Sequence, residues 1–377
     1  MTSSTSGSIY DGGAHIFELL HLLVHADDAT IIASSRFRTI SKLKSLLEYC
    51  KLNCIIPQFT KCEFLVVNGT VDDQAPIPFG NTMLENVEHI LLLGSHLTSS
   101  ASLPRELELH MNKRFKSVIK FYNYIRANKL APLSVKLKVL KACVLGSLLH
   151  NCETFGKYIP KELESVYNKM LKCCLNVRSN TPNYIAYIES GCLPIRAVIM
   201  SRQWKFYKRF LDTVASNSRR KKTFSSLLQN KTEYLSYYEN LYSKYDCAED
   251  IISEFRDTVK EYVIQRANTD HYKFKIYLDI NPDLNPSPFL HIIHPLVNDI
   301  VKFRLGSHYL PIETGRWNRT PRQERLCQNC NILGDERHAI YECSLIDRQG
   351  INLHEDISMI WQQASIYTLF KRIKLFL

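Results

Sequence analysis

The first clear pattern in the chain is a pair of short apolar runs that flank two adjacent acids, Asp27 and Asp28. The runs are partly β-branched and an Asp-Asp pair is typical of a turn. Residues 21–33 are therefore predicted to form a β-hairpin with both carboxylates at its tip. Apolar side chains then recur at helical spacing, which predicts a helix over Ser41–Leu52.

From about Leu103 the apolar positions follow a helical period. One stripe contains Leu107, Met111, Phe115, Val118 and Tyr122, and a second contains Leu137, Leu140, Val144 and Leu148. Helices are predicted to continue over 161–212 and 223–280. The tyrosines between 234 and 245 could stack on nucleic-acid bases, but we expect them to pack helices together. The predicted fold class is α+β, mostly α.

Composition adds a charge argument to this pattern. The chain has 377 residues, a net charge of +11 and 45% hydrophobic residues, so it has enough material for a folded core. The basic excess favours a polyanionic partner, first of all RNA or DNA, with simple solubilisation as the alternative. A basic run at 219–222 could serve nuclear import or phosphate binding, although short runs of this kind are common on surfaces.

The cysteines and the apolar stretches indicate the compartment. Cys143, Cys173 and Cys174 lie within apolar helical patterns and are predicted to be buried free thiols in a reducing environment. The apolar stretch at 16–24 is too short to span a bilayer and lacks the features of a signal peptide. We expect a nuclear or cytoplasmic protein with no transmembrane segment, and the sequence indicates no oligomeric state.

Near the C-terminus, Cys327, Cys330, His338 and Cys343 follow the order Cys-x2-Cys-x7-His-x4-Cys. Three thiolates and one imidazole can close a tetrahedral Zn²⁺ site, and Gly334 between the two halves is predicted to permit a chain reversal. With all four positions filled, the metal would be structural. The alternative is a pair of structural thiols beside an unrelated histidine.

The acids of the hairpin have two interpretations as well. Asp-Asp between strands is usually a solvated turn, but a rigid hairpin that presents carboxylates also suits Mg²⁺. The flanking pattern resembles the Tyr-Ala-Asp-Asp box of reverse transcriptases, with His25 in place of Tyr. Residues 58–67 and 87–94 are similar to the Asn-x-x-Lys-Thr and primer-grip segments of non-LTR, LINE-type reverse transcriptases. That family also often carries a Cys-Cys-His-Cys motif near its C-terminus.

The resemblance implies roles for particular residues. Asp27 would be a metal ligand supported by Asp28, Lys61 would lie near the nucleotide phosphates, and Gly94 would belong to the primer grip. It also implies a polymerase palm followed by a helical thumb. Four segments are expected on this basis: a disordered start at 1–15, a partial palm at 16–98, a thumb or connector at 99–280, and a C-terminal module with the zinc motif at 281–377.

The resemblance does not extend to the whole polymerase domain. Polymerases of this family use a further Asp on an earlier strand, and 26 residues precede Asp27. Two neighbouring acids cannot hold two metal ions about 3.5–4 Å apart. We therefore expect the C-terminal part of a non-LTR reverse transcriptase that does not polymerise alone, with Mg²⁺ bound only if the missing palm segment is supplied. The alternatives are a non-catalytic nucleic-acid-binding protein and an inert remnant.

Overall fold

The computed structural model describes residues 22–25, 28–216, 232–269, 272–351, 353–354, 356–361 and 365–373. The chain forms two compact units, each built from three separate segments. Unit 1 comprises Met1–Lys113, Leu149–Pro160 and Ile199–Ala248, and unit 2 comprises Arg114–Leu148, Lys161–Val198 and Glu249–Leu377.

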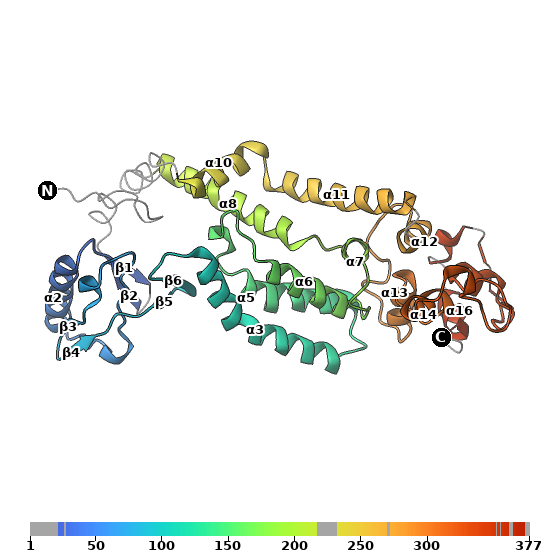
Figure 1. Cartoon of the computed structure of the whole chain (residues 1–377), viewed down its shortest axis with the longest axis horizontal. Coiled ribbons are helices and arrows are strands. Elements are labelled where there is room, and N and C mark those ends of the chain that lie inside the picture. Colours follow the sequence, from blue (N-terminus) through green and yellow to red (C-terminus); the bar gives the residue numbers. More distant parts are fainter. Residues whose placement is uncertain are drawn as a thin grey trace. The chain divides into compact units, whose positions relative to one another are not determined.

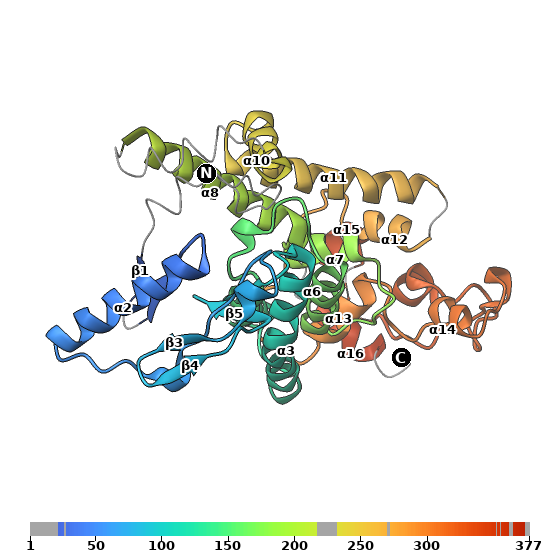
Figure 2. The same ribbon diagram turned by 60° about the vertical axis from the view of Figure 1, so that its left-hand side comes forward.

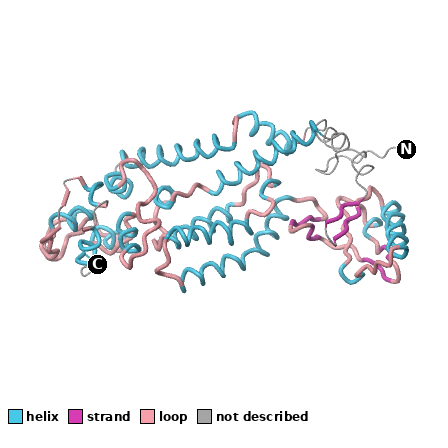
Figure 3. Tube along the Cα trace, turned by 180° about the vertical axis from the view of Figure 1, so that it is seen from behind, coloured by secondary structure: helices cyan, strands magenta, loops and turns pink. Residues whose placement is uncertain are grey.

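Unit 1 contains all the named strands, as three antiparallel hairpins (Figures 1 and 3). They are β1 (Leu22–His25) with β2 (Asp28–Ile31), β3 (Ile77–Phe79) with β4 (Thr82–Leu84), and β5 (His89–Leu92) with β6 (Ser95–Thr98). The first hairpin pairs His25 with Asp28, which confirms the strand pairing predicted for this stretch. Short antiparallel hairpins cannot build a core alone, so they depend on neighbouring helices.

Strand β2 and the β3–β4 hairpin pack against α2 (Arg36–Leu52), which lies beside that hairpin (Figure 2). Leu43 of this helix joins Ile77, Phe79 and Leu84 in one apolar cluster. The helix begins five residues before the predicted start, because the hydroxyl of Ser35 accepts a hydrogen bond from the backbone N–H of Arg38. Ser is a favoured N-cap residue, and the apolar period could not locate it.

The remaining elements of unit 1 are helical. They are the 3₁₀ turns η1 (Phe59–Lys61), η2 (Asp72–Gln74) and η4 (Cys152–Thr154), the helix α10 (Glu233–Lys244), and parts of α3 (Leu103–Ala127) and α8 (Ile195–Ser216). Tyr238 of α10 is 1% exposed and stacks on Tyr207 of α8, with ring centroids 5.9 Å apart. The tyrosine-rich segment therefore packs helices, as predicted.

The regular elements described in unit 2 are helices and helical turns, joined by loops, with one isolated antiparallel bridge between Leu326 and Leu333. Its elements are the rest of α3 and α8, α4 (Leu133–Val139), the π-helical turn η3 (Leu140–Leu145), α5 (Gly146–Leu148), α6 (Lys161–Cys174), α7 (Asn183–Ser190), α11 (Ala248–Asn268), α12 (Tyr272–Ile280), α13 (Val297–Arg304), α14 (Pro311–Trp317), η5 (Arg322–Glu324), the π-helical turn η6 (His338–Glu342), α15 (Ile357–Ile360) and α16 (Ile366–Ile373). The stripe Leu137, Leu140, Val144 and Leu148 is fully buried, as its helical period predicts.

An ion pair lies inside unit 2 between elements far apart in sequence. The Arg304 guanidinium donates from Nε to Oε1 of Glu189 at 2.8 Å and from Nη2 to Oε2 at 3.1 Å. The Tyr277 hydroxyl donates to the same carboxylate at 3.0 Å. Side-chain exposures of 2% for Arg304 and 0% for Glu189 place both charges in the interior, where only such complete pairing makes burial tolerable.

The mostly helical fold with small antiparallel sheets is the fold class that the sequence predicts. Two side-chain predictions are wrong. The Cys143 thiol is exposed, because it lies off the helix face on which Leu140 and Val144 are buried. Phe115 is 47% exposed although it belongs to the predicted stripe of α3. Cys173 is half-buried and Cys174 is buried, and all twelve cysteines are free.

Several predictions lie outside the described residues or stay untested. The disordered start at 1–15 and the basic run at 219–222 fall in segments that the structure does not describe. The division into four segments stays a prediction. Across the described helices, none combines the length and apolarity that crossing a bilayer requires.

Candidate metal centre

Four side chains predicted to bind a metal converge in unit 2. One ligand atom from each of Cys327, Cys330, His338 and Cys343 lies within 4.8 Å of the others. The Sγ atom of Cys343 is 3.9 Å from that of Cys327 and 4.0 Å from that of Cys330. Two thiolates bound at about 2.3 Å in a tetrahedron stand roughly 3.8 Å apart, so the spacing fits one shared ion.

A tight turn positions the first two ligands. The backbone N–H of Cys327 donates to the carbonyl of Ile332 at 2.7 Å, and the N–H of Asn331 donates to the carbonyl of Cys327 at 2.9 Å. Asn331 adopts the left-handed conformation, with φ of 54°, that reverses the chain. Asn tolerates this region better than most residues, so the reversal does not need Gly334.

Gly334 has a different role from the predicted one. Its φ lies outside the left-handed region, and a Cβ there would lie 2.6 Å from Cγ of Pro311. Its carbonyl accepts a hydrogen bond from the N–H of Ile312 at 3.1 Å. The glycine therefore lets the backbone approach the start of α14 closely, which ties the metal-binding turn to the rest of unit 2.

The other two ligands lie at the two ends of one π-helical turn, η6. The backbone N–H of Cys343 donates to the carbonyl of His338 at 2.8 Å, which brings both side chains to the same side. The carboxylate of Asp335 caps the start by accepting from the N–H of His338 at 2.9 Å. Arg348 donates to the carbonyls of Ala339, Ile340, Cys343 and Ile346 at 2.7–3.1 Å.

The unpaired state of the His338 imidazole supports metal binding. The side chain is 4% exposed, yet neither ring nitrogen has a hydrogen-bond partner among the described residues. The Oε2 atom of Glu342 is 3.5 Å from Nδ1, beyond good hydrogen-bonding distance but on the correct side to orient the ring. A metal at Nε2 would satisfy the buried imidazole, as is usual for metal-bound histidines.

The cysteines differ in their readiness to bind as thiolates. Hydrogen bonds from Ser344 lower the pKa of Cys330 to about 6, and Asn329 adds to the effect. The Ser344 hydroxyl lies 3.3 Å from Sγ of Cys330. Burial raises the pKa of Cys343 instead. A cation among the three sulfurs would stabilise their charged forms, and soft thiolate ligands with one imidazole suit zinc.

A buried polar network that sequence reasoning missed anchors the residues before the π-helical turn. Glu336 is 0% exposed, and its carboxylate is 2.8 Å from Nε2 of His308 and 2.7 Å from the hydroxyl of Tyr272. Lys273 pairs with Glu313 at 2.7 Å nearby, with both side chains buried. These partners are 28 to 64 residues apart in sequence, so no local pattern indicates them.

The residues assigned by resemblance to polymerase chemistry lie on separate elements of unit 1. Asp28 is exposed at the start of β2, and Asp27 lies outside the described residues. Lys61 is exposed at the end of η1, and Gly94 forms the β5–β6 turn with φ of 84°. Among the described residues, the cluster at 327–343 is the one group of three or more potential metal ligands.

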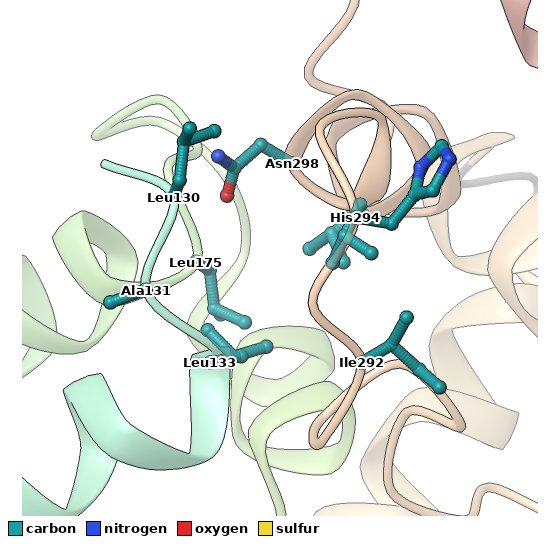
Figure 4. A pocket seen from close by; sticks show the side chains of 9 residues that line it. Leu130, Ala131, Leu133, Leu175, Ile292, His294 and Asn298 are labelled. Carbon is teal, nitrogen blue, oxygen red and sulfur yellow. The ribbon is translucent and has the colours of Figure 1, made fainter. Parts of the chain in front are cut away.

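Unit 2 also contains a small pocket lined by Leu130, Leu133, Leu175, Ile292 and His294, among other residues (Figure 4). The space open to a water-sized molecule there is about 10 Å³, which is no more than one water needs. The lining is mostly apolar and converges on no charged group. The pocket is therefore a packing gap rather than a ligand site.

Comparison with known proteins identifies no relative. No family model matches the chain, and searches of curated proteins and of solved structures find no match.

Proposed function

We propose that the chain corresponds to the C-terminal part of a non-LTR retrotransposon RNA-directed DNA polymerase and that its own role is to bind nucleic acid without chemistry. The convergence of the Cys-Cys-His-Cys cluster carries this proposal, because that motif belongs to the resemblance and its ligands meet at one point. The β1–β2 hairpin around the acid pair supports it. The net charge of +11 supports a polyanionic partner.

In this proposal the metal is zinc and its role is structural. Cys327, Cys330, His338 and Cys343 would hold it, and four protein ligands leave no position for substrate. Bound zinc would fix the turn at 327–331 to the π-helical turn at 338–342. The arginines that precede the cluster, Arg316, Arg322 and Arg325, would then keep one geometry against RNA or DNA.

Metal analysis tests the zinc part of the proposal. The purified chain is expected to carry about one zinc ion, and Cys330→Ser is expected to lose it because three ligands hold zinc far more weakly. Cys143→Ser is the matched control, since that thiol is exposed and lies outside the cluster. Equal zinc content in both variants would contradict the assignment.

Binding and extension assays test the function itself. We expect the chain to bind RNA and DNA oligonucleotides with an affinity that falls steeply as salt rises, because phosphate contacts release counterions. With Mg²⁺, primer and RNA template we expect no synthesis, since among the described residues Asp28 belongs to no cluster of three or more potential metal ligands. Synthesis abolished by Asp27→Ala would show that the chain is catalytic, and absence of any binding would reject the proposed role.

A further inference from the structure

An arginine lies across two exposed aromatic rings in unit 2. The Arg178 guanidinium is 3.3 Å from the ring centroid of Trp317 and 4.8 Å from that of Tyr309. The two rings meet edge to face with centroids 5.6 Å apart. Tyr309 is 59% exposed and Trp317 is 38% exposed. We call Arg178, Tyr309 and Trp317 the aromatic platform.

The platform is held in place by the elements that carry it. Trp317 ends α14, and Tyr309 lies just before that helix. Arg178 belongs to the connection between α6 and α7, and its backbone N–H donates to the buried Ser307 hydroxyl at 2.9 Å. Two segments distant in sequence, the α6–α7 connection and residues 309–317, thus place these side chains together on a fixed backbone.

The arginine of the platform and two that follow Trp317 in the sequence have hydrogen-bond donors that no described carboxylate uses. Among the described residues, no carboxylate forms an ion pair with Arg178, Arg319 or Arg322. Arg319 is exposed two residues after Trp317, and Arg322 lies 4.4 Å from the ring of Tyr272. A guanidinium that stacks on a ring keeps its edge free for phosphate, which distinguishes it from lysine.

We propose that the aromatic platform binds single-stranded nucleic acid, with bases stacked on Tyr309 and Trp317 and phosphates paired with Arg178 and Arg319. Exposed aromatic rings interleaved with free cations match unstacked bases on a charged backbone, whereas a duplex hides its base faces. This inference rests on the proposed nucleic-acid-binding function and names the surface and strand type within it.

The test uses the full chain with zinc bound and a labelled 12-nucleotide RNA, the same sequence as DNA, and the matching duplex. Tyr309→Ser and Arg178→Gln are expected to weaken single-strand binding about five- to a hundredfold, the usual loss when a stacking side chain is removed. Ile293→Ser and Arg196→Gln are the matched controls in unit 2, since both side chains are exposed. The controls should remain within about twofold of the unchanged protein.

Tryptophan fluorescence gives a second measurement on the unmodified protein. Trp204 and Trp361 are only 5% and 3% exposed, so Trp317 is the tryptophan that a bound base can reach. Single strands should quench the emission, and Trp317→Phe should remove that quenching. Quenching by single-stranded RNA alone, or by single-stranded RNA and DNA alike, would support the proposal. The comparison would also identify which sugar the surface accepts.

The outcomes separate this inference from the function on which it rests. If the protein binds oligonucleotides but the platform variants bind as well as their controls, the platform is rejected and the proposed function stands. Tighter binding of duplex than of single strands would also overturn the platform. If the unchanged protein binds no nucleic acid, the proposed function fails, and the inference fails with it.

Discussion

At the scale of single residues, the four ligands of the metal cluster are held in place by side chains that are not ligands, such as Asp335 and Arg348. The four ligands Cys327, Cys330, His338 and Cys343 are close in sequence, and this local spacing correctly predicted that their side chains converge. Glu336 anchors the same region, but its partners His308 and Tyr272 come from distant segments. Arg348 bonds carbonyls only two to nine residues away, yet no spacing pattern indicates that role. The prediction that Gly334 reverses the chain is wrong for a similar reason. The position needs a glycine because Pro311, from another segment, leaves no room for a Cβ there.

The carboxylate beside His338 is expected to tune metal affinity. Glu342→Ala should weaken zinc binding about tenfold, at the lower end of the usual range for such supports, since the Glu342 side chain is 58% exposed. Competition with a fluorescent chelator measures this, and Glu324→Ala is the control because that side chain is also exposed. Unchanged affinity in Glu342→Ala would show that it does not orient the imidazole.

The buried ion pair is expected to be costly to break from one side. Glu189→Leu leaves the Arg304 guanidinium uncompensated in the interior and should lower the free energy of unfolding by about 3–5 kcal/mol. The double variant Glu189→Leu with Arg304→Met removes both charges and should lose less than the single variant. Urea denaturation measures the free energy of unfolding of the single and the double variant. A double variant less stable than Glu189→Leu alone would contradict the argument.

At the scale of elements, hydrophobic periodicity located helices but not their ends or irregular turns. The helix predicted at Ser41–Leu52 exists, yet the Ser35 cap extends it. The helix predicted from the stripe Leu137, Leu140, Val144 and Leu148 also exists, but it passes into the π-helical turn Leu140–Leu145. Cys143 is exposed although Leu140 and Val144 beside it are buried, because an apolar surrounding pattern does not place a residue's own side chain on the buried face of the helix.

The π-helical turn η6 is expected to depend on one arginine. Arg348→Met removes hydrogen bonds to four carbonyls and should lower the stability of the zinc-loaded protein by about 2–3 kcal/mol. Arg337→Met is the control, because its ion pair with Asp279 is exposed and such pairs contribute less than about 1 kcal/mol. Thermal unfolding compares the stability of the two variants. Equal losses of stability in Arg348→Met and Arg337→Met would mean that the carbonyls find other hydrogen-bond donors.

At the scale of the molecule, the hydrophobic pattern predicted a mostly helical chain with small sheets, and the structure agrees. Removing the metal should affect only part of that chain. Under chelation, amide hydrogen exchange is expected to rise over 326–346, where metal binding contributes folding energy. The cluster of Leu43, Ile77, Phe79 and Leu84 should keep its protection, because it lies in the other unit. A uniform rise across both units would contradict a local structural role.

The interleaving of the two units also has a consequence for synthesis. The chain passes between the units after residues 113, 148, 160, 198 and 248, so neither unit is a continuous stretch. Unit 1 cannot be completed before its last segment, Ile199–Ala248, has left the ribosome. The 149–160 segment must therefore wait for α10, whose Tyr238 hydroxyl accepts a hydrogen bond from the N–H of Gly156 across 82 residues of sequence. A nascent chain of this kind needs protection from aggregation, and no single cut can release either unit intact.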